Sequence, residues 1–218
     1  MKCKIIEKGD KVIVISPEAE GCIGKSADEL LQNCDKYIEK SGFRMVPQET
    51  KVLEELEEVL AYYEAQGRTF YKYVEMDMLL QEYQVPEMVV PDSVSFGFFD
   101  GAIEELHEAV AQVEEDWVQY FTEGGKYFCG FVNGEIASFC IIDYDEDCII
   151  ADENTRVGSA GCVGTLPKYR KQGIGLYMVA LATQALKEAG CDKGFIHYTA
   201  LESWYAKLGY KSFMRFYM

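Results

Sequence analysis

Residues 161–175 read GCVGTLPKYRKQGIG and are the most informative stretch of the chain. An apolar run leads through Pro167 into a basic turn, and Gly173 and Gly175 then precede a long apolar segment that favours a helix. A glycine turn at the start of a helix presents backbone N–H groups and the positive end of the helix dipole to an anion. The stretch therefore predicts an anion-binding loop.

The distribution of charge supports this interpretation. The chain has 37 Asp and Glu against 21 Lys and Arg, and its formal net charge is −16. No Asp or Glu lies between Asn154 and Lys187, and the basic residues inside this interval are Arg156, Lys168, Arg170 and Lys171. An acidic protein that binds a polyanion needs such a local gap in its negative field.

Length and composition narrow the class of protein. A chain of 218 residues suits one large domain, or one domain with a smaller partner, and its 49% hydrophobic and 27% charged residues are typical of a globular protein with a real core. The acidic balance argues against nucleic acid and against anionic membranes as partners. It is compatible with a cationic small molecule, although solubility explains acidity equally well.

The cysteines and histidines predict neither a metal site nor a disulfide framework. The chain has eight Cys without a Cys-x-x-Cys pair, and its histidines are His107 and His197. Several Cys lie inside apolar runs, as expected of free thiols in a reducing cytosol. Residues 1–7 lack the apolar core of a signal peptide, and the longest uncharged run, 172–186, is too short to span a bilayer. We therefore expect a cytoplasmic protein with no membrane partner.

The first 90 residues alternate between strand and helix signals. The segments 3–6 and 11–15 predict a hairpin, and Ser26 with Glu29 forms a capping box that opens a helix ending near Gly42. A second helix is predicted over 49–66, with an apolar stripe at Val52, Leu53, Leu56, Val59, Leu60 and Tyr63. An extended segment at 69–80 and a connector at 86–91 follow, and we place a domain boundary at the connector.

The remaining residues predict a longer alternation of strands and helices. Asn133-Gly134 is a strong signal for a two-residue hairpin turn. Residues 145–147 predict a turn, and residues 148–151 an extension of the sheet. The predicted strands are 94–99, 126–132, 135–144, 159–166, 191–199 and 210–218, and the predicted helices are 102–121, 174–189 and 201–208.

Spacing excludes two common nucleotide-binding motifs. A dinucleotide fingerprint needs a third glycine where the chain has Met178, and a nucleoside-triphosphate loop needs Lys and Ser or Thr where the chain has Leu176 and Tyr177. A Gly-x-Gly pair by itself is also common in simple tight turns.

The pattern that does match is Arg-x-x-Gly-x-Gly, formed by Arg170, Gly173 and Gly175. It resembles the acetyl-CoA pyrophosphate loop of the GNAT acyltransferase superfamily. The stretch WYAKLGY at 204–210 resembles the C-terminal signature of that superfamily, and the element order from Val94 onward agrees with its fold. The resemblance implies an α/β (α+β) fold, a GNAT-type mixed central β-sheet flanked by helices, over residues 91–218. Residues 1–90 are then an N-terminal α/β extension of unknown role.

The resemblance also implies a co-substrate and roles for particular residues. Acetyl-CoA would be held at its pyrophosphate by Arg170, Lys171, Gln172, Gly173, Ile174 and Gly175. The backbone of Val163, Gly164 and Thr165 would bind the pantetheine arm, and the Thr165 N–H would polarise the thioester carbonyl. Tyr205 would protonate the departing thiolate. Its alternative role is that of a packing aromatic.

These roles predict an N-acetyltransferase that transfers acetyl to a primary amine of a small cationic substrate by direct attack on the thioester. The general base is open, because the strand before the loop carries no carboxylate. The candidates are Asp143, Asp145, Asp152, Glu153, His197 and a water chain. Of these, His197 reads more readily as a satisfied core histidine than as a base. Tyr198-Thr199-Ala200 stands where the superfamily has an Asn, which leaves that contact to the coenzyme open.

Two other functions are compatible with the sequence. A fold that binds acyl-CoA but lacks a base would be a non-catalytic sensor or a partner-binding module. A structural domain with an empty loop is the third alternative. The sequence is compatible with a homodimer and does not identify the acceptor.

Overall fold

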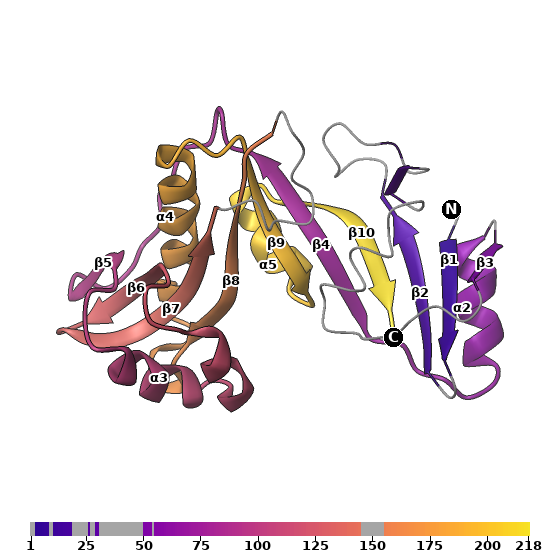
Figure 1. Ribbon diagram of the computed structural model, residues 1–218, viewed down its shortest axis with the longest axis horizontal. Helices are drawn as coiled ribbons and strands as arrows, with labels where there is room; N and C mark the ends of the chain where they lie inside the picture. The colour runs from indigo at the N-terminus through magenta and orange to yellow at the C-terminus, as the bar shows by residue number, and fades with distance from the viewer. Residues whose placement is uncertain are drawn as a thin grey trace. The chain divides into compact units, whose positions relative to one another are not determined.

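The structure, a computed structural model, describes residues 3–8, 11–18, 26, 29–30, 50–53, 55–144 and 155–218. The chain divides into two compact units (Figure 1). Unit 1 is formed by the residues up to Met78 together with Ile196–Met218, and unit 2 by Leu79–Phe195. The predicted division into residues 1–90 and 91–218 stays a prediction.

Unit 1 contains an antiparallel sheet in the order β3-β1-β2-β10-β4. The predicted N-terminal hairpin is confirmed by the pairing of β1 with β2, and β10 lies between β2 and β4. The strands are β1 (Cys3–Lys8), β2 (Lys11–Pro17), β3 (Thr50–Leu53), β4 (Lys72–Leu79) and β10 (Lys211–Tyr217).

Helix α2 (Leu56–Glu64) packs its apolar stripe on the β1–β2 hairpin. The buried residues of this cluster are Cys3, Ile5, Val12, Val14, Leu56, Val59 and Tyr63. Near the C-terminus, α5 (Glu202–Tyr205) continues into a short 3₁₀ turn, η3 (Ala206–Leu208), which confirms the short helix expected there.

The predicted helix over residues 49–66 is wrong in its first part. Residues 50–53 form β3, which pairs antiparallel with β1 from Cys3↔Leu53 to Ile6↔Thr50. The β-branched Thr50 and Val52 favour a strand, and long-range pairing with β1 decides the matter against the local helical pattern. The helix begins at Leu56.

The capping box is confirmed. The Ser26 N–H and hydroxyl donate to Glu29 Oε2 at 2.7 and 2.9 Å, and the Glu29 N–H donates to Ser26 Oγ at 3.2 Å. Residues 29–30 are helical, and Leu30 is buried. The remainder of the predicted helix lies outside the described residues, as do residues 145–154 with the turn and the strand extension expected there.

Unit 2 is built on a mixed sheet. The strands β5 (Val94–Phe98), β6 (Tyr127–Val132), β7 (Glu135–Asp143) and β8 (Val157–Thr165) pair antiparallel in that order. Strand β9 (Lys193–Thr199) begins parallel to β8, with Val157↔Lys193. The hairpin between β6 and β7 turns at Asn133 and Gly134, both at positive φ, as predicted.

Helices cover both faces of this sheet (Figure 1). Tyr127 and Cys129 of β6 face α3 (Ile103–Ala111), whereas the alternate residue Phe128 lies on the same face as Phe98 and Phe96. Phe96 packs edge-on against Tyr177 of α4 (Ile174–Glu188). This mixed sheet flanked by helices confirms the fold class that the resemblance implies.

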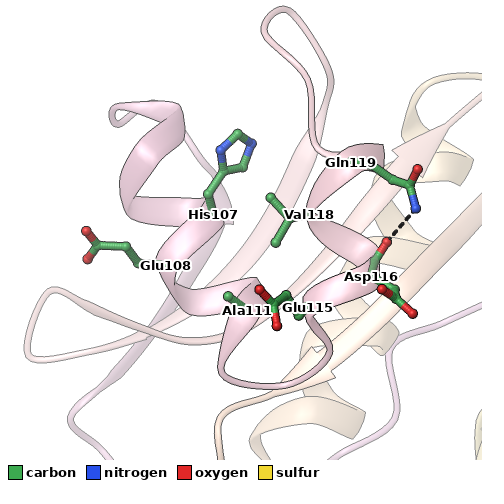
Figure 2. A pocket seen from close by; sticks show the side chains of 7 residues that line it. All are labelled: His107, Glu108, Ala111, Glu115, Asp116, Val118 and Gln119. Atoms are coloured by element: carbon green, nitrogen blue, oxygen red, sulfur yellow. Dashed lines mark hydrogen bonds between the residues drawn. The ribbon is translucent and has the colours of Figure 1, made fainter.

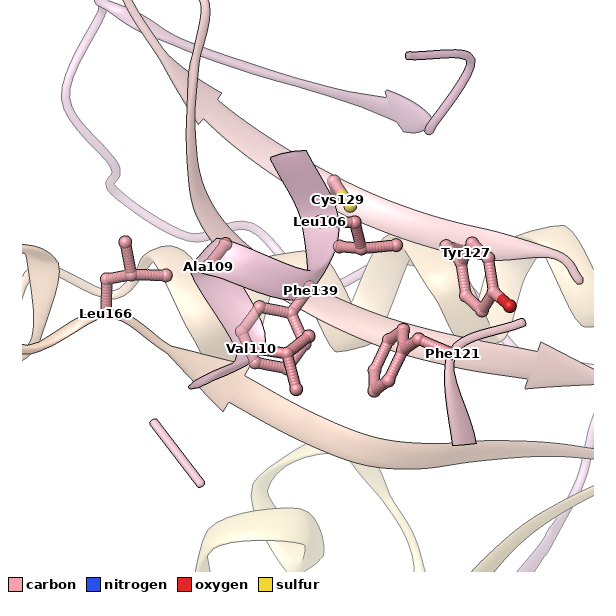
Figure 3. Packing of buried hydrophobic residues seen from close by; sticks show 8 residues of the cluster. All are labelled: Leu106, Ala109, Val110, Phe121, Tyr127, Cys129, Phe139 and Leu166. Carbon is pink, nitrogen blue, oxygen red and sulfur yellow. The ribbon is translucent and has the colours of Figure 1, made fainter. Parts of the chain in front are cut away.

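The predicted helix over residues 102–121 is broken in the structure. Helix α3 ends at Ala111, and a 3₁₀ segment, η1 (Glu115–Tyr120), follows an extended Glu114. The break brings Phe121 into the core, where its ring lies edge-on to Phe139 with centroids 5.5 Å apart (Figure 3). Packing on β7 therefore outweighs the continuation of the local helical pattern.

Candidate functional site: a glycine loop and a carboxylate–imidazole pair

The loop after β8 has the shape that its sequence predicts. A 3₁₀ turn, η2 (Pro167–Tyr169), follows β8, and the backbone is left-handed at Lys171, with φ 63°, and again at Gly173, with φ 81°. Gly173 is the N-cap of α4. A Cβ at this residue would lie 3.1 Å from the Val89 carbonyl oxygen, so both its φ and its neighbours favour glycine.

The start of α4 has no capping side chain, and its first turn carries no acidic residue. The first backbone N–H groups of a helix have no acceptor within the helix, and the helix dipole makes this end electropositive. Ile174 and Gly175 are buried there, whereas Lys171, Gln172 and Gly173 are exposed. The arrangement suits an anion held by backbone N–H groups.

The side chains of the loop are partly engaged with the protein itself. Arg170 Nε donates to the Thr165 carbonyl at 3.0 Å, and Gln172 Nε2 donates to the Lys168 carbonyl at 3.3 Å. Lys168 Nζ lies 2.7 Å from Glu135 Oε2 in an exposed ion pair, and its hydrogen bond lowers the pKa of the Glu135 carboxyl. The acid-free interval in the sequence is therefore not acid-free in space, because β7 supplies Glu135.

Strand β8 reaches the loop through a bulge. Its register against β7 shifts between Phe139 and Ile141, and Cys162 has φ 46° in this stretch. Bulges re-aim backbone groups and are common beside active sites. Gly164 is buried against Phe139, whose ring carbon would lie 2.3 Å from a Cβ added at position 164. Val163 and Thr165 are half-buried.

Tyr205 belongs to unit 1, where it is 4% exposed at the end of α5. Its ring lies edge-on to Trp204, with centroids 4.8 Å apart, and to Tyr210, with centroids 6.2 Å apart. The loop of residues 163–175 belongs to unit 2.

A polar cluster anchors the helix that carries Tyr205. Glu202, at the start of α5, accepts from Lys72 Nζ at 2.5 Å, from Ser212 Oγ at 2.7 Å and from Arg215 at 3.1 Å. Partial burial alone would raise the pKa of Glu202, but these donors and the Arg215 charge lower it to about 2. The cluster ties α5 to β4 and β10.

Sequence reasoning missed a buried carboxylate, Glu75 on β4, which is 0% exposed. His197 Nδ1 lies 2.9 Å from Glu75 Oε1 and 3.0 Å from Oε2, and the Tyr198 N–H donates to Oε2 at 3.2 Å. The His197 side chain is 32% exposed, so it lies at the surface end of this pair rather than in the core. Burial raises the pKa of Glu75, while the hydrogen bond from His197 opposes this shift.

The one sequence signal for Glu75 is the stretch VEMDM at 74–78, where acidic residues alternate within an apolar strand. Tyr198, which stands near the expected Asn, has φ 45° and stacks on Tyr73 at 4.4 Å between centroids. Of the other predicted bases, Asp143 is half-buried at the end of β7. The remaining ones, Asp145, Asp152 and Glu153, lie outside the described residues.

A wide surface depression of about 630 Å³ lies over α3 and η1 (Figure 2). Its lining residues are His107, Glu108, Ala111, Glu115, Asp116, Val118 and Gln119, and none belongs to the loop. His107 Nε2 lies 2.6 Å from the Phe121 carbonyl oxygen. Among the described residues, no cluster of His, Cys, Asp and Glu could hold a metal ion. In the same residues, no helix is long and apolar enough to cross a membrane.

A mixed sheet whose strand β8 leads through a glycine loop to an uncapped helix defines an acyltransferase-type α/β fold. Residues 93–210 match the model of the acetyltransferase (GNAT) family, and this is more than half of the 218 residues. The chain therefore belongs to the GNAT acetyltransferase family.

Solved structures agree at the level of the fold. The chain is similar to the GCN5-related glucosamine N-acetyltransferase region of a fungal multi-domain GH3 β-N-acetylglucosaminidase, with 18% identity, a TM-score of 0.60, and coverage of 99% of this chain and 31% of that one. It is also similar to a GCN5-related N-acetyltransferase from Sphaerobacter thermophilus, with 16% identity, a TM-score of 0.53, and coverage of 74% and 55%. This chain thus spans about a third to about half of those proteins. No curated protein gives a significant match.

Proposed function

We propose that this protein is an acetyl-CoA-dependent N-acetyltransferase that acts on a primary amine of a small cationic substrate. The observation that carries the proposal is that α4 begins without a capping side chain, directly after a loop whose backbone is left-handed at Lys171 and Gly173. Acetyl-CoA supplies an activated thioester and a pyrophosphate. The pyrophosphate carries about two negative charges, which backbone N–H groups at a helix start neutralise without large side chains.

Each predicted residue has a role in this proposal. The loop residues Arg170, Lys171, Gln172, Gly173, Ile174 and Gly175 bind the pyrophosphate, and the backbone of Val163, Gly164 and Thr165 binds the pantetheine arm. The Thr165 N–H donates to the thioester carbonyl oxygen, a contact that gains strength as negative charge develops there. Tyr205 gives a proton to the departing sulfur.

The rest of the proposal concerns the acceptor and the setting. The net charge of −16 favours a cationic acceptor, and the solved fungal relative, described as a glucosamine N-acetyltransferase region, makes D-glucosamine the first amine to test. The described cysteines, Cys3, Cys129, Cys140, Cys162 and Cys191, are free thiols, which supports a reducing, cytoplasmic setting. A homodimer, and the lack of nucleic-acid or membrane partners, stay predictions.

Calorimetric titration with acetyl-CoA tests the loop. Lys171→Glu reverses a charge at an exposed loop residue, so we expect Kd to rise roughly tenfold, and the effect to shrink at high salt. Lys211→Glu makes the same change at an exposed residue of β10 and should leave Kd within about twofold.

Wild-type protein that gives no binding heat with acetyl-CoA would overturn the proposal. Turnover is measured by chromatographic detection of coenzyme A, with D-glucosamine, spermidine, lysine and an aminoglycoside as acceptors. Chromatography avoids thiol reagents, which also react with protein cysteines. Tight binding without turnover of any amine would favour the non-catalytic sensor instead.

A further inference from the structure

The Glu75–His197 pair has the geometry of an oriented imidazole. When the Glu75 carboxyl is ionised it only accepts hydrogen bonds, so Nδ1, at 2.9 and 3.0 Å from its oxygens, then donates to it. In the neutral ring with its hydrogen on Nδ1, the second nitrogen, Nε2, carries no hydrogen. A neutral imidazole held in this tautomer can accept a proton at Nε2.

The carboxylate itself is held in place. Glu75 is 0% exposed, and the Tyr198 N–H donates to its Oε2 at 3.2 Å, while Tyr198 is in turn stacked on Tyr73. A buried carboxylate whose orientation is fixed can balance the charge of an imidazolium that forms beside it. Two of the groups that face His197 are the Glu75 carboxyl from β4 and the Tyr198 ring on its own strand.

A purely structural pair is the alternative. In that reading His197 serves only to satisfy a buried carboxylate. The exposure of the His197 side chain, 32% against 0% for Glu75, favours a chemical role, because a proton acceptor must be reachable from outside the core. The described part of β8 carries no carboxylate that could take this role instead.

We propose that His197 removes the proton from the acceptor ammonium, with Glu75 as its positioning residue, which rests on the acetyltransferase function proposed above. The N–H bond of the ammonium breaks, its electron pair stays on the amine nitrogen, and the proton binds Nε2. The amine nitrogen then bonds to the acetyl carbon as the C–S bond breaks. Sulfur keeps that electron pair and takes the hydroxyl proton of Tyr205. Tyr205 regains a proton from the second N–H of the nitrogen, and His197 releases its proton to solvent.

Steady-state kinetics of full-length variants test this role. His197→Gln should lower kcat/KM for D-glucosamine, or for another panel amine that the wild type acetylates, by about a hundredfold or more. His107→Gln is the matched control, because it changes the other histidine of the chain, on α3, and should leave kcat/KM within about twofold. Added imidazole should restore part of the rate to His197→Ala.

Glu75→Gln keeps the shape of the side chain but removes its charge. We expect kcat to fall about tenfold or more while KM and the Kd for acetyl-CoA stay unchanged. A readout independent of activity is the ¹⁵N spectrum of the imidazoles. With only two histidines in the chain, His107→Gln assigns the signals, and His197 should show the Nδ1–H tautomer in the wild type and lose this preference in Glu75→Gln.

The outcomes separate the two proposals. If the wild type acetylates an amine and His197→Gln loses less than about threefold in rate, or if imidazole does not restore His197→Ala, the inference is wrong and the acetyltransferase function stands. An Nε2–H tautomer in the wild type would also overturn it. If the wild type binds no acetyl-CoA, or acetylates no amine, both proposals fall together.

Discussion

Tyr205 combines a predicted chemical role with a buried position. Its ring makes edge-on contacts with the rings of Trp204 and Tyr210. The polar cluster around Glu202 anchors α5, the helix that carries Tyr205. Such packing holds a phenol in one orientation, which a proton donor needs. It equally well describes a tyrosine that only fills the core, so removal of the hydroxyl alone is the informative change.

We expect Tyr205→Phe to lower kcat about a hundredfold without a change in acetyl-CoA binding, because the variant keeps the ring and loses only the proton. The rate is measured as coenzyme A release, and binding by calorimetry. Tyr210→Phe, at a ring packed against Tyr205, is the control and should retain its rate. Full activity in Tyr205→Phe would leave Tyr205 as a packing residue.

The glycine loop could be predicted from local sequence, whereas the Glu75–His197 pair could not. Gly173 and Gly175 lie directly before the helix, and their spacing alone indicates a turn at its start. Glu75 and His197 are 122 positions apart, and only the pairing of distant elements brings them together. Burial of Glu75 follows from the position of β4 in its sheet, which the alternation of residues along β4 does not reveal.

Strand β8 has two structural roles. It leads the chain into the loop, and it packs on β7 closely enough that Gly164 has no room for a side chain beside Phe139. Gly161, on the same strand, has nothing within 4 Å of a Cβ position. Alanine substitutions at these two positions therefore separate the steric cost of a new methyl group from the general effect of replacing a glycine.

Gly164→Ala should lower the free energy of unfolding by about 1–3 kcal/mol, because the new methyl group overlaps the Phe139 ring. Gly161→Ala should change it by less than about 0.5 kcal/mol. Urea unfolding measures both. The cost of Gly164→Ala should shrink in a Phe139→Leu background, and an equal cost in both backgrounds would show that Phe139 is not the cause.

Elements set by local signals were predicted well, and elements set by distant contacts were not. The Asn133-Gly134 hairpin, the Ser26–Glu29 capping box and the start of α4 all depend on neighbouring residues. Strand β3 forms because β1 is there to pair with it. Helix α3 stops early because Phe121 packs on Phe139, a contact that no helical period encodes.

At the scale of the whole molecule, the family match and the compact units do not share their boundaries. The family model covers 93–210, whereas unit 1 combines residues from both sides of unit 2. The C-terminal strand β10 takes its hydrogen-bonding neighbours, β2 and β4, from the first 90 residues. Those residues therefore contribute to the sheet that the C-terminal segment needs.

A fragment of residues 91–218 tests this dependence. It lacks both neighbours of β10, so we expect it to unfold at a lower temperature than the full chain, or to aggregate through the exposed edges of that strand. Circular dichroism melting and size-exclusion chromatography measure the two effects. A fragment as stable and as monomeric as the full chain would support residues 91–218 as a self-sufficient domain.

The place of β10 between β2 and β4 also has a consequence for synthesis. Unit 2 is one continuous segment, Leu79–Phe195, and can fold as soon as it has left the ribosome. Strands β2 and β4 are made before it and β10 after it, so the sheet of unit 1 lacks an inner strand for on the order of ten seconds at usual elongation rates. During that interval the edges of β2 and β4 that later pair with β10 are unpaired, and they can pair with strands of other nascent chains. Chaperones that bind nascent chains would prevent such pairing.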